Sequence, residues 1–279
     1  MTGKAIVCYG GFLGVLLLVT VALSQTSVAS SEQSEQVKPS FSLLNSFPLY
    51  YVDRDGASSG FTHDLAKFMF GGTGIEYTPV PLPPDRLIRQ LSAGLQDFAV
   101  LYRLPEVFPD LEFFATLGCQ HIVLVPMIGS GITKLADVSG KRVAFMKDGR
   151  FDRLYSTKLD MISMPVSQVK NIFAMAAIGN VDAVVFNEIA FNSSMRFDKE
   201  DSGVLPGMDE AFGDAIHLLE VELSIAVSRK SKFLHLVPAL RDFIESSRKS
   251  GAFEPIFQEY GSVSGGRCST IKIAALSDE

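Results

Sequence analysis

The sequence is poor in the residues that build metal and nucleophilic centres, and it has no glycine-rich phosphate loop. Of its three cysteines, Cys8 lies in an N-terminal apolar segment, which leaves Cys119 and Cys268 in the rest of the chain. Neither has a Cys or His at metal-ligand spacing, so a zinc site is not expected. The four histidines are far apart in the sequence and stand in no recognisable triad motif: His63, His121, His217 and His235. We therefore predict no metal and no cofactor.

The chain also lacks an excess of positive charge. Without Lys4, which lies in the N-terminal segment, 24 basic residues face 31 acidic ones, a net charge of −7. This balance argues against nucleic acid and against anionic lipid surfaces as partners.

The first 29 residues are typical of a secretory signal peptide. Lys4 is their only charge, Ala5 to Leu23 is uncharged and mostly apolar, and Ser27-Val28-Ala29 offers small side chains at both recognition positions of a signal peptidase. We predict export to the periplasm with cleavage near Ala29. The alternative is an uncleaved anchor, because 19 apolar residues approach the roughly 20 that span a bilayer. The polar stretch 30–39 is predicted to be a flexible leader.

Two stretches of the remaining chain echo each other. Gly94-Leu-Gln-Asp97 and Gly179-Asn-Val-Asp182 each follow an amphipathic helical stretch, and each leads into an apolar run. Two copies of a helix–turn–Asp–strand unit suggest two similar α/β lobes with a cleft between them, which is a natural place for a small molecule. Asp97 and Asp182 themselves are expected to be structural, each closing a turn before a buried strand.

Hydrophobic periodicity predicts strands and helices in alternation, and hence largely parallel sheets covered by helices. The predicted strands are 41–46, 75–80, 98–102, 141–146, 161–164 and 183–186, with 121–126 and 223–228 as crossovers between the lobes. The predicted helices begin or lie at 60–69, 84–93, 133–140, 151–157, 167–178, 187, 231–247 and 252–260.

Several segments together resemble the bacterial extracellular solute-binding proteins of the polar amino-acid type (family 3). They are Gly60-Phe61-Thr-His-Asp64-Leu65-Ala66, Leu87-Ile88-x-x-Leu91-x-x-Gly94-x-x-Asp97, Leu135-x-Asp137-x-x-Gly140-Lys141-Arg142-Val143, Gly179-x-x-Asp182-Ala183-Val184, and Gly251-x-Phe253-x-x-Ile256-x-x-x-Tyr260-Gly261. The resemblance implies an α/β periplasmic binding protein type II fold, with two lobes, two hinge crossover strands and a ligand in the cleft. It also implies a partner in the inner membrane, either an ABC permease or a sensor.

This resemblance, with the predicted elements, divides the chain into five parts. They are the signal peptide 1–29, the leader 30–39, lobe 1 at 40–123 plus 224–261, lobe 2 at 124–223, and a C-terminal tail at 262–279. We expect a monomer with two sheets around a gap. Cys119 and Cys268 form a disulfide or remain separate thiols; export permits the bridge.

The sequence departs from the family's usual ligand clamp at two places. Family members usually fix an α-carboxylate with an arginine after the first Gly-x-x-Asp strand, where Val107 stands, and an α-ammonium with an aspartate, where Asn187 stands. An ion buried without its partner costs about 3–5 kcal/mol. We therefore predict a ligand other than an ordinary α-amino acid held in the usual way.

Eight residues are predicted to bind the ligand: Phe47, Tyr50, Tyr102, Arg103, Gly149, Arg150, Asn187 and Glu188. They stand at strand-to-helix junctions, where helix N-termini present free N–H groups. Arg103 and Arg150 favour a carboxylate-bearing ligand, because a guanidinium matches a carboxylate in geometry.

Each of these candidates also has a structural alternative. Arg103 could instead pair with Glu106 or Asp110, and Arg150 with Asp148 or Asp152. The three aromatic residues could belong to the core. Asn187 is a good helix N-cap, and Glu188 could simply favour the N-terminus of its own helix.

The function we predict is non-catalytic capture of a small polar, carboxylate-bearing solute by lobe closure, for an ABC importer. One alternative is a periplasmic sensory module that no longer transports. The other is an enzyme similar to the cyclohexadienyl dehydratases of this fold, with Glu188 as its acid, which would need a carboxyl of raised pKa near the reacting atom.

Overall fold

The computed structural model describes residues 37–53, 55–104, 108–147, 159–196, 204, 207–260 and 268. The signal peptide, most of the leader and tail, Gly149, Arg150 and the predicted helix 151–157 lie outside these residues. The chain from Lys38 onward forms one compact unit. No helix in the described ranges is both long and apolar enough to cross a membrane.

Eight strands form one sheet in the order β4-β1-β5-β10-β6-β9-β7-β8. Their bounds are β1 Ser40–Leu44, β4 Thr78–Leu82, β5 Phe98–Tyr102, β6 Leu111–Pro126, β7 Arg142–Met146, β8 Ile162–Val166, β9 Ala183–Asn187 and β10 Ile216–Ser228. The strands β1, β4 and β5 are mutually parallel, as are β7, β8 and β9. The long strands β6 and β10 pair antiparallel between these two groups. A small hairpin, β2 (Tyr51–Val52) with β3 (Ser58–Ser59), stands apart.

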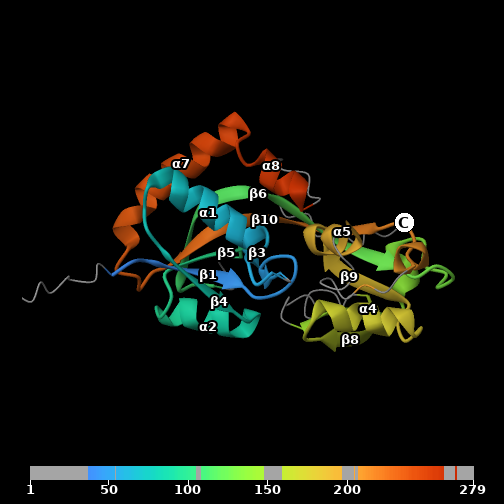
Figure 1. Ribbon diagram of the computed structural model, residues 1–279. Coiled ribbons are helices and arrows are strands. Elements are labelled where there is room, and N and C mark those ends of the chain that lie inside the picture. The colour runs from blue at the N-terminus through green and yellow to red at the C-terminus, as the bar shows by residue number, and fades with distance from the viewer. Residues whose placement is uncertain are drawn as a thin grey trace, which may run out of the picture. The chain divides into compact units, whose positions relative to one another are not determined.

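Helices follow the parallel strands, as the alternating pattern predicts (Figure 1). Around the first half of the sheet, α1, α7 and α8 lie together on one side and α2 on the other, while α4 and α5 belong to the second half. Their bounds are α1 Phe61–Thr73, α2 Pro84–Ala93, α4 Val169–Ala177, α5 Glu188–Arg196, α7 Val237–Ser250 and α8 Glu254–Glu259. Short 3-10 turns occupy Leu135–Val138, Met208–Ala211 and Leu234–Leu236.

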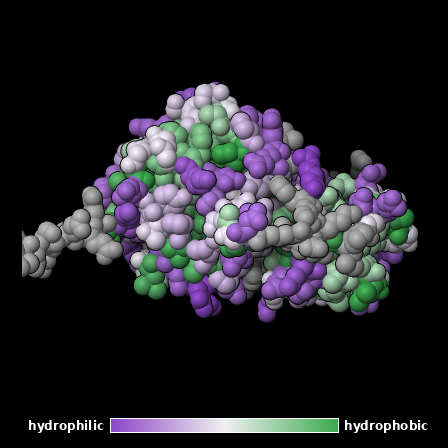
Figure 2. Space-filling view, viewed as in Figure 1, coloured by the Kyte–Doolittle hydropathy of each residue, from purple (hydrophilic) through white to green (hydrophobic). Residues whose placement is uncertain are grey.

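The apolar side chains are gathered between these layers. The side chains of Phe41, Phe98 and Leu87 are completely buried in the first half, and those of Phe173 and Ala183 in the second. On the face shown in Figure 2, hydrophilic residues are spread among the hydrophobic ones. Burial of this apolar surface is the main force that holds the sheet and its helices together.

The two Gly-x-x-Asp units have the same structural role in the two halves. Asp97 stands directly before β5, and its carboxylate accepts the N–H of Ser40, the first residue of β1, at 2.8 Å. Asp182 stands directly before β9, and its carboxylate accepts the N–H of Arg142, the first residue of β7, at 2.8 Å. Each aspartate therefore ties the start of its own strand to the start of the neighbouring parallel strand.

The expectation of two separate sheets is wrong. The predicted crossovers 121–126 and 223–228 are only the C-terminal parts of β6 and β10, which are 16 and 13 residues long. Because both strands run through the two halves, they join them into one hydrogen-bonded sheet. The predicted lobe boundaries at 123/124 and 223/224 stay a prediction.

Candidate ligand chamber and the crossover strands

A chamber of about 250 Å³ opens between the two halves of the sheet. Its walls come from the ends of β1, β5, β7 and β9, from the starts of α1, α2, α4 and α5, and from the middle of β6 and β10. The carboxyl ends of parallel strands are where ligands bind in open α/β sheets. The order of elements in the sequence is therefore enough to place the chamber.

The chamber wall is apolar. Among the described residues that line it, none carries a formal charge, and polar side chains come only from Ser46, Thr62, Tyr102, Gln120 and Asn187. Three of these already bond to the backbone. Thr62 Oγ1 donates to Leu49 O at 2.7 Å, Gln120 Nε2 donates to Cys119 O at 3.1 Å, and Asn187 accepts a backbone N–H. The rest of the described wall consists of aliphatic and aromatic side chains, one methionine and one proline.

Tyr102 and Asn187 connect the two halves at the chamber. Tyr102 ends β5 and Asn187 ends β9. The Oδ1 atom of Asn187 accepts the N–H of Ala190 at 2.6 Å, which confirms the predicted N-cap of α5. Burial raises the pKa of the Tyr102 phenol, and a hydrogen bond from the Asn187 side chain lowers it in part. Tyr102 is therefore neutral at physiological pH and offers a polar group in an otherwise apolar wall.

The structure brings three of the eight predicted ligand residues to the chamber: Phe47, Tyr102 and Asn187. Tyr50 lies in the core of the first half, where its hydroxyl is 3.0 Å from Ser58 Oγ. Gly149 and Arg150 lie outside the described residues, so their predicted role stays a prediction.

The two charged candidates among the described residues point elsewhere. Arg103 is exposed, and its Nε atom lies 3.8 Å from Glu222 Oε1. Of the two acids considered from the sequence as its partner, Glu106 lies outside the described residues. The Oε2 atom of Glu188 lies 3.1 Å from His121 Nδ1. Neither Arg103 nor Glu188 lines the chamber.

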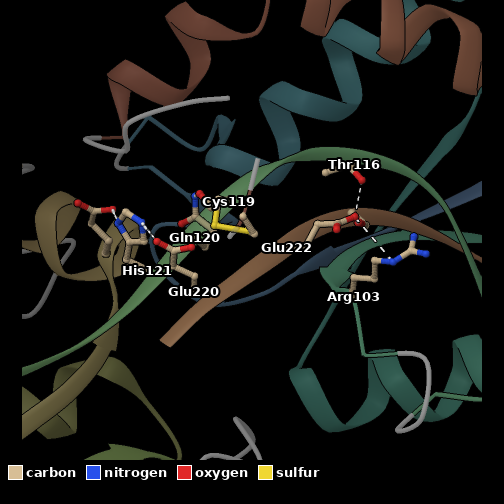
Figure 3. Close-up of a disulfide and its surroundings, with 10 residues drawn as sticks. Arg103, Thr116, Cys119, Gln120, His121, Glu220 and Glu222 are labelled. Atoms are coloured by element: carbon tan, nitrogen blue, oxygen red, sulfur yellow. Dashed lines mark hydrogen bonds and ion pairs between the residues drawn. A yellow bond between two sulfur atoms is a disulfide. The ribbon is translucent and has the colours of Figure 1, made fainter. Parts of the chain in front are cut away.

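The alternation of strand residues explains this separation. On β10, Leu219, Val221 and Leu223 line the chamber, so Glu220 and Glu222 point to the opposite face. Figure 3 shows the resulting row of polar side chains along the crossover strands. Glu222 contacts Arg103 and accepts a hydrogen bond from Thr116.

A disulfide lies in the same row. Cys119 on β6 is bonded to Cys268, across a sequence separation of 149 residues. Of the two alternatives left open by the sequence, the structure has the bridge. It attaches the C-terminal region to the middle of a crossover strand.

Sequence reasoning missed the neighbourhood of His121, His217 and Glu220. These residues come from two strands that are about 95 residues apart in the sequence, and only the antiparallel pairing of β6 with β10 brings them together. The rings of His121 and His217 are 4.9 Å apart between centroids. The sequence predicts both crossover strands, and a prediction that they pair with each other would have brought these three residues together.

No protein-family model and no curated protein matches this sequence significantly. Solved structures do match. An ABC uptake transporter substrate-binding protein from Streptococcus pneumoniae with bound histidine has a TM-score of 0.64 at 18% identity, over 82% of this chain and 94% of that one. A histidine kinase sensor domain with similarity to periplasmic binding proteins has a TM-score of 0.65 at 15% identity, over 83% and 98%.

A third match is an ancestral amino-acid-binding protein that is a precursor of cyclohexadienyl dehydratase. It has a TM-score of 0.63 at 16% identity, over 80% of this chain and 94% of that one. All three likenesses are at the level of the fold. They confirm the fold class predicted from the sequence. The chain has the type II fold of periplasmic binding proteins, in which two α/β halves are joined by two crossover strands.

Proposed function

We propose that this protein is an exported, non-catalytic binding protein that captures a small, mainly apolar solute in the chamber between its halves. The observation that carries the proposal is the chamber wall, whose described residues include no charged side chain. A volume of about 250 Å³ lies just below the range of about 300–1,000 Å³ that is typical of small-molecule sites, so the ligand is small.

Electrostatics decides between an apolar solute and an ordinary amino acid. A zwitterion brings two charges into the site, and an unpaired buried charge costs about 3–5 kcal/mol. Three kcal/mol is more than a hundredfold in affinity. A neutral molecule with one polar group avoids this cost, because Tyr102 or Gln120 can meet that group while the apolar wall covers the rest.

The ligand's predicted carboxylate depends on Arg150, which lies outside the described residues. We therefore retain a terminal carboxylate as the finer version of the proposal, on an otherwise apolar molecule. Arg103 is left out of it, because its guanidinium faces Glu222.

The fold supports binding rather than chemistry. Glu188, the acid that a dehydratase-like reaction would use, contacts His121 and does not line the chamber. We propose that the two halves close on the solute by bending at the crossover strands, as in other hinge proteins. The closed form, a monomer in the periplasm, then docks on an ABC permease or a sensor in the inner membrane.

Calorimetric titration with matched ligands tests this proposal. The probes are 3-phenylpropanamide, the corresponding acid 3-phenylpropanoate, L-arginine and L-glutamate. We expect the amide to bind and the two amino acids not to bind. If Arg150 meets the carboxylate, the acid binds at least as well as the amide, and Arg150→Gln weakens only the acid. Otherwise the acid binds more than about a hundredfold more weakly than the amide, because its charge is unpaired.

A matched pair of variants shows whether the probe occupies the chamber. Val221 lines it and is 3% exposed, whereas Val52 is 56% exposed on β2. Val221→Phe should fill the chamber and abolish binding of the amide, and Val52→Phe should leave it unchanged. Tight binding of L-arginine or L-glutamate, with no binding of either phenyl compound, would show that the proposal is wrong.

A further inference from the structure

We propose that His121, His217 and Glu220 form a binding site for a divalent transition-metal ion on the crossover strands, on the face turned away from the ligand chamber. Each residue offers one donor atom, and the three atoms lie within 4.8 Å of one another. Two imidazoles and a carboxylate are a ligand set that suits Zn²⁺. The proposal is independent of the solute that the chamber binds.

A bulge in β10 builds the cluster. Residues three apart in a regular strand point to opposite faces, so His217 and Glu220 would normally be separated by the sheet. In this strand Glu220 pairs with His121, Leu219 with Ile122 and His217 with Val123, which leaves Leu218 as an extra residue. Bulges re-aim side chains in this way.

The core shows the effect of the bulge directly. Leu218 and Leu219 are consecutive, yet both are buried in the same hydrophobic cluster of the second half. His217 and Glu220, on either side of them, consequently both turn toward His121. The extra residue therefore places His217 and Glu220 on the same face of the sheet, which a regular strand would not do.

Glu188 holds the ring of His121 in a suitable orientation. Its Oε2 atom lies 3.1 Å from Nδ1 of His121, and an ionised carboxylate can only accept a hydrogen bond. The Nδ1 atom is thus the donor, and in the neutral ring the lone pair is on Nε2, which lies 3.7 Å from Glu220 Oε1 (Figure 3). A carboxylate behind a histidine is the usual outer partner at metal sites, where it fixes the tautomer. Glu188 is a positioning residue here.

The site is reachable from solvent and needs only a small adjustment. His217 is exposed, and the side chains of His121 and Glu220 are 34% and 26% exposed. Tetrahedral zinc with bonds of about 2.0–2.1 Å places its ligands about 3.3 Å apart, so the widest donor separation must shrink by at most about 1.5 Å. Rotation of the exposed His217 side chain can supply this movement. Three protein ligands leave a fourth position for water.

The consequence for the protein is a cross-link between its two crossover strands. His121 belongs to β6, and His217 and Glu220 belong to β10. Glu188 connects the same site to the first turn of α5, one residue after the chamber residue Asn187. A bound ion should therefore stabilise the folded protein, because it binds the folded chain and not the unfolded one.

The test is titration of the oxidised, chelator-treated protein with Zn²⁺, followed by calorimetry and by the melting temperature. We expect one ion per chain, a higher melting temperature with Zn²⁺, and loss of both effects in His217→Ala and Glu220→Gln. Glu188→Gln should weaken binding by roughly 10–100-fold without abolishing it, as at other outer-shell positions. His235→Ala, at an exposed histidine in the 3-10 turn Leu234–Leu236, is the matched control and should bind like the wild type.

Co²⁺ supplies a second readout that does not depend on stability. Coordination by imidazole nitrogen changes its visible spectrum, and the change should appear in the wild type and in His235→Ala but not in His217→Ala. Circular dichroism of each metal-free variant shows that it is folded. No binding of either ion by the wild type would overturn the proposal, and so would binding that His217→Ala and Glu220→Gln leave unchanged.

Discussion

The contact between Asp182 and Arg142 predicts a specific loss of stability. The Asp182 carboxylate accepts the backbone N–H of Arg142 at 2.8 Å and two bonds from its guanidinium, at 3.1 and 2.9 Å. Asp182→Asn keeps one acceptor oxygen, which can still accept the two bonds made to Oδ2, but it loses the negative charge and the bond from the guanidinium to Oδ1. Such bonds contribute about 1.5–3 kcal/mol each when shielded.

Solvent reduces that sum. The Arg142 side chain is 39% exposed and can bind water in the variant, whereas the Asp182 side chain is only 24% exposed. We therefore expect a loss of about 2 kcal/mol rather than 4 or more, from the lost guanidinium bond and from the weaker bonds to the uncharged oxygen that remains. For a chain of this length this corresponds to a fall in melting temperature of about 4–8 °C. Asp242→Asn, at an exposed position on α7, is the matched control and should change stability by less than about 0.5 kcal/mol.

The same contact predicts the sign of a pH effect. Hydrogen bonds from the Arg142 side chain, followed by its backbone N–H, hold the pKa of Asp182 below its ordinary value, against the opposing effect of burial. A depressed folded-state pKa contributes stability above the unfolded pKa of about 3.9, and this is lost as pH falls through the folded value. Urea unfolding at pH 7 and at several pH values below 4 should show the wild type and Asp182→Asn converging in acid. An unchanged difference, or a loss no larger than that of Asp242→Asn, would refute this reasoning.

Two further contacts give predictions of the same kind. Cys119→Ser opens the bridge to Cys268. For a separation of 149 residues, the chain-entropy model sets an upper limit of about 5 kcal/mol on the resulting loss of folding stability. Urea unfolding should show the free energy of unfolding falling by about 2–4 kcal/mol, and reduction of the wild type should reproduce this decrease. Tyr260→Phe removes a hydroxyl that donates to Asp64 at 2.6 Å between α8 and α1, and calorimetric melting should show a loss of about 2 kcal/mol. An unaltered melting temperature would mean that water replaces this bond.

Local patterns in the sequence are sufficient to predict most of the helices and strands. The amphipathic stretch 84–93 is α2 with the same bounds, and the apolar run 98–102 is β5. The repeated Gly-x-x-Asp pattern predicts two related halves, and Asp97 and Asp182 each accept the first backbone N–H of the neighbouring parallel strand. These features depend on residues within one turn or one strand, which is the range over which hydrophobic periodicity carries information.

The long strands were underestimated because their stability comes from distant pairing. Residues 111–120 belong to β6 and pair with 221–228 of β10, more than 100 positions away. Between these strands the register shifts at three places, which breaks the alternation that a sequence reader would follow. The joining of the two halves into one sheet depends on these pairs and therefore could not be predicted from local pattern.

The candidate site shows a different limit. Tyr102 and Arg103 were both assigned to the ligand, yet consecutive residues at a strand end point to opposite faces. Tyr102 lines the chamber and Arg103 contacts Glu222 on the other side. The period of the strand could have excluded one of the two. The proposed metal ligands, by contrast, depend on a bulge at Leu218 that no turn residue marks.

The two faces of the crossover strands can therefore have separate functions. One face of β10 presents Leu219 and Val221 to the chamber, and the other presents Glu220 and Glu222 to polar partners. A slip of one residue in register would exchange these faces and place two carboxylates in the apolar chamber, at several kcal/mol for each unpaired charge. This cost fixes the register of the strands. It also means that an ion bound at the proposed site would act on the same strands that bend in the proposed closure of the halves, without touching the solute itself.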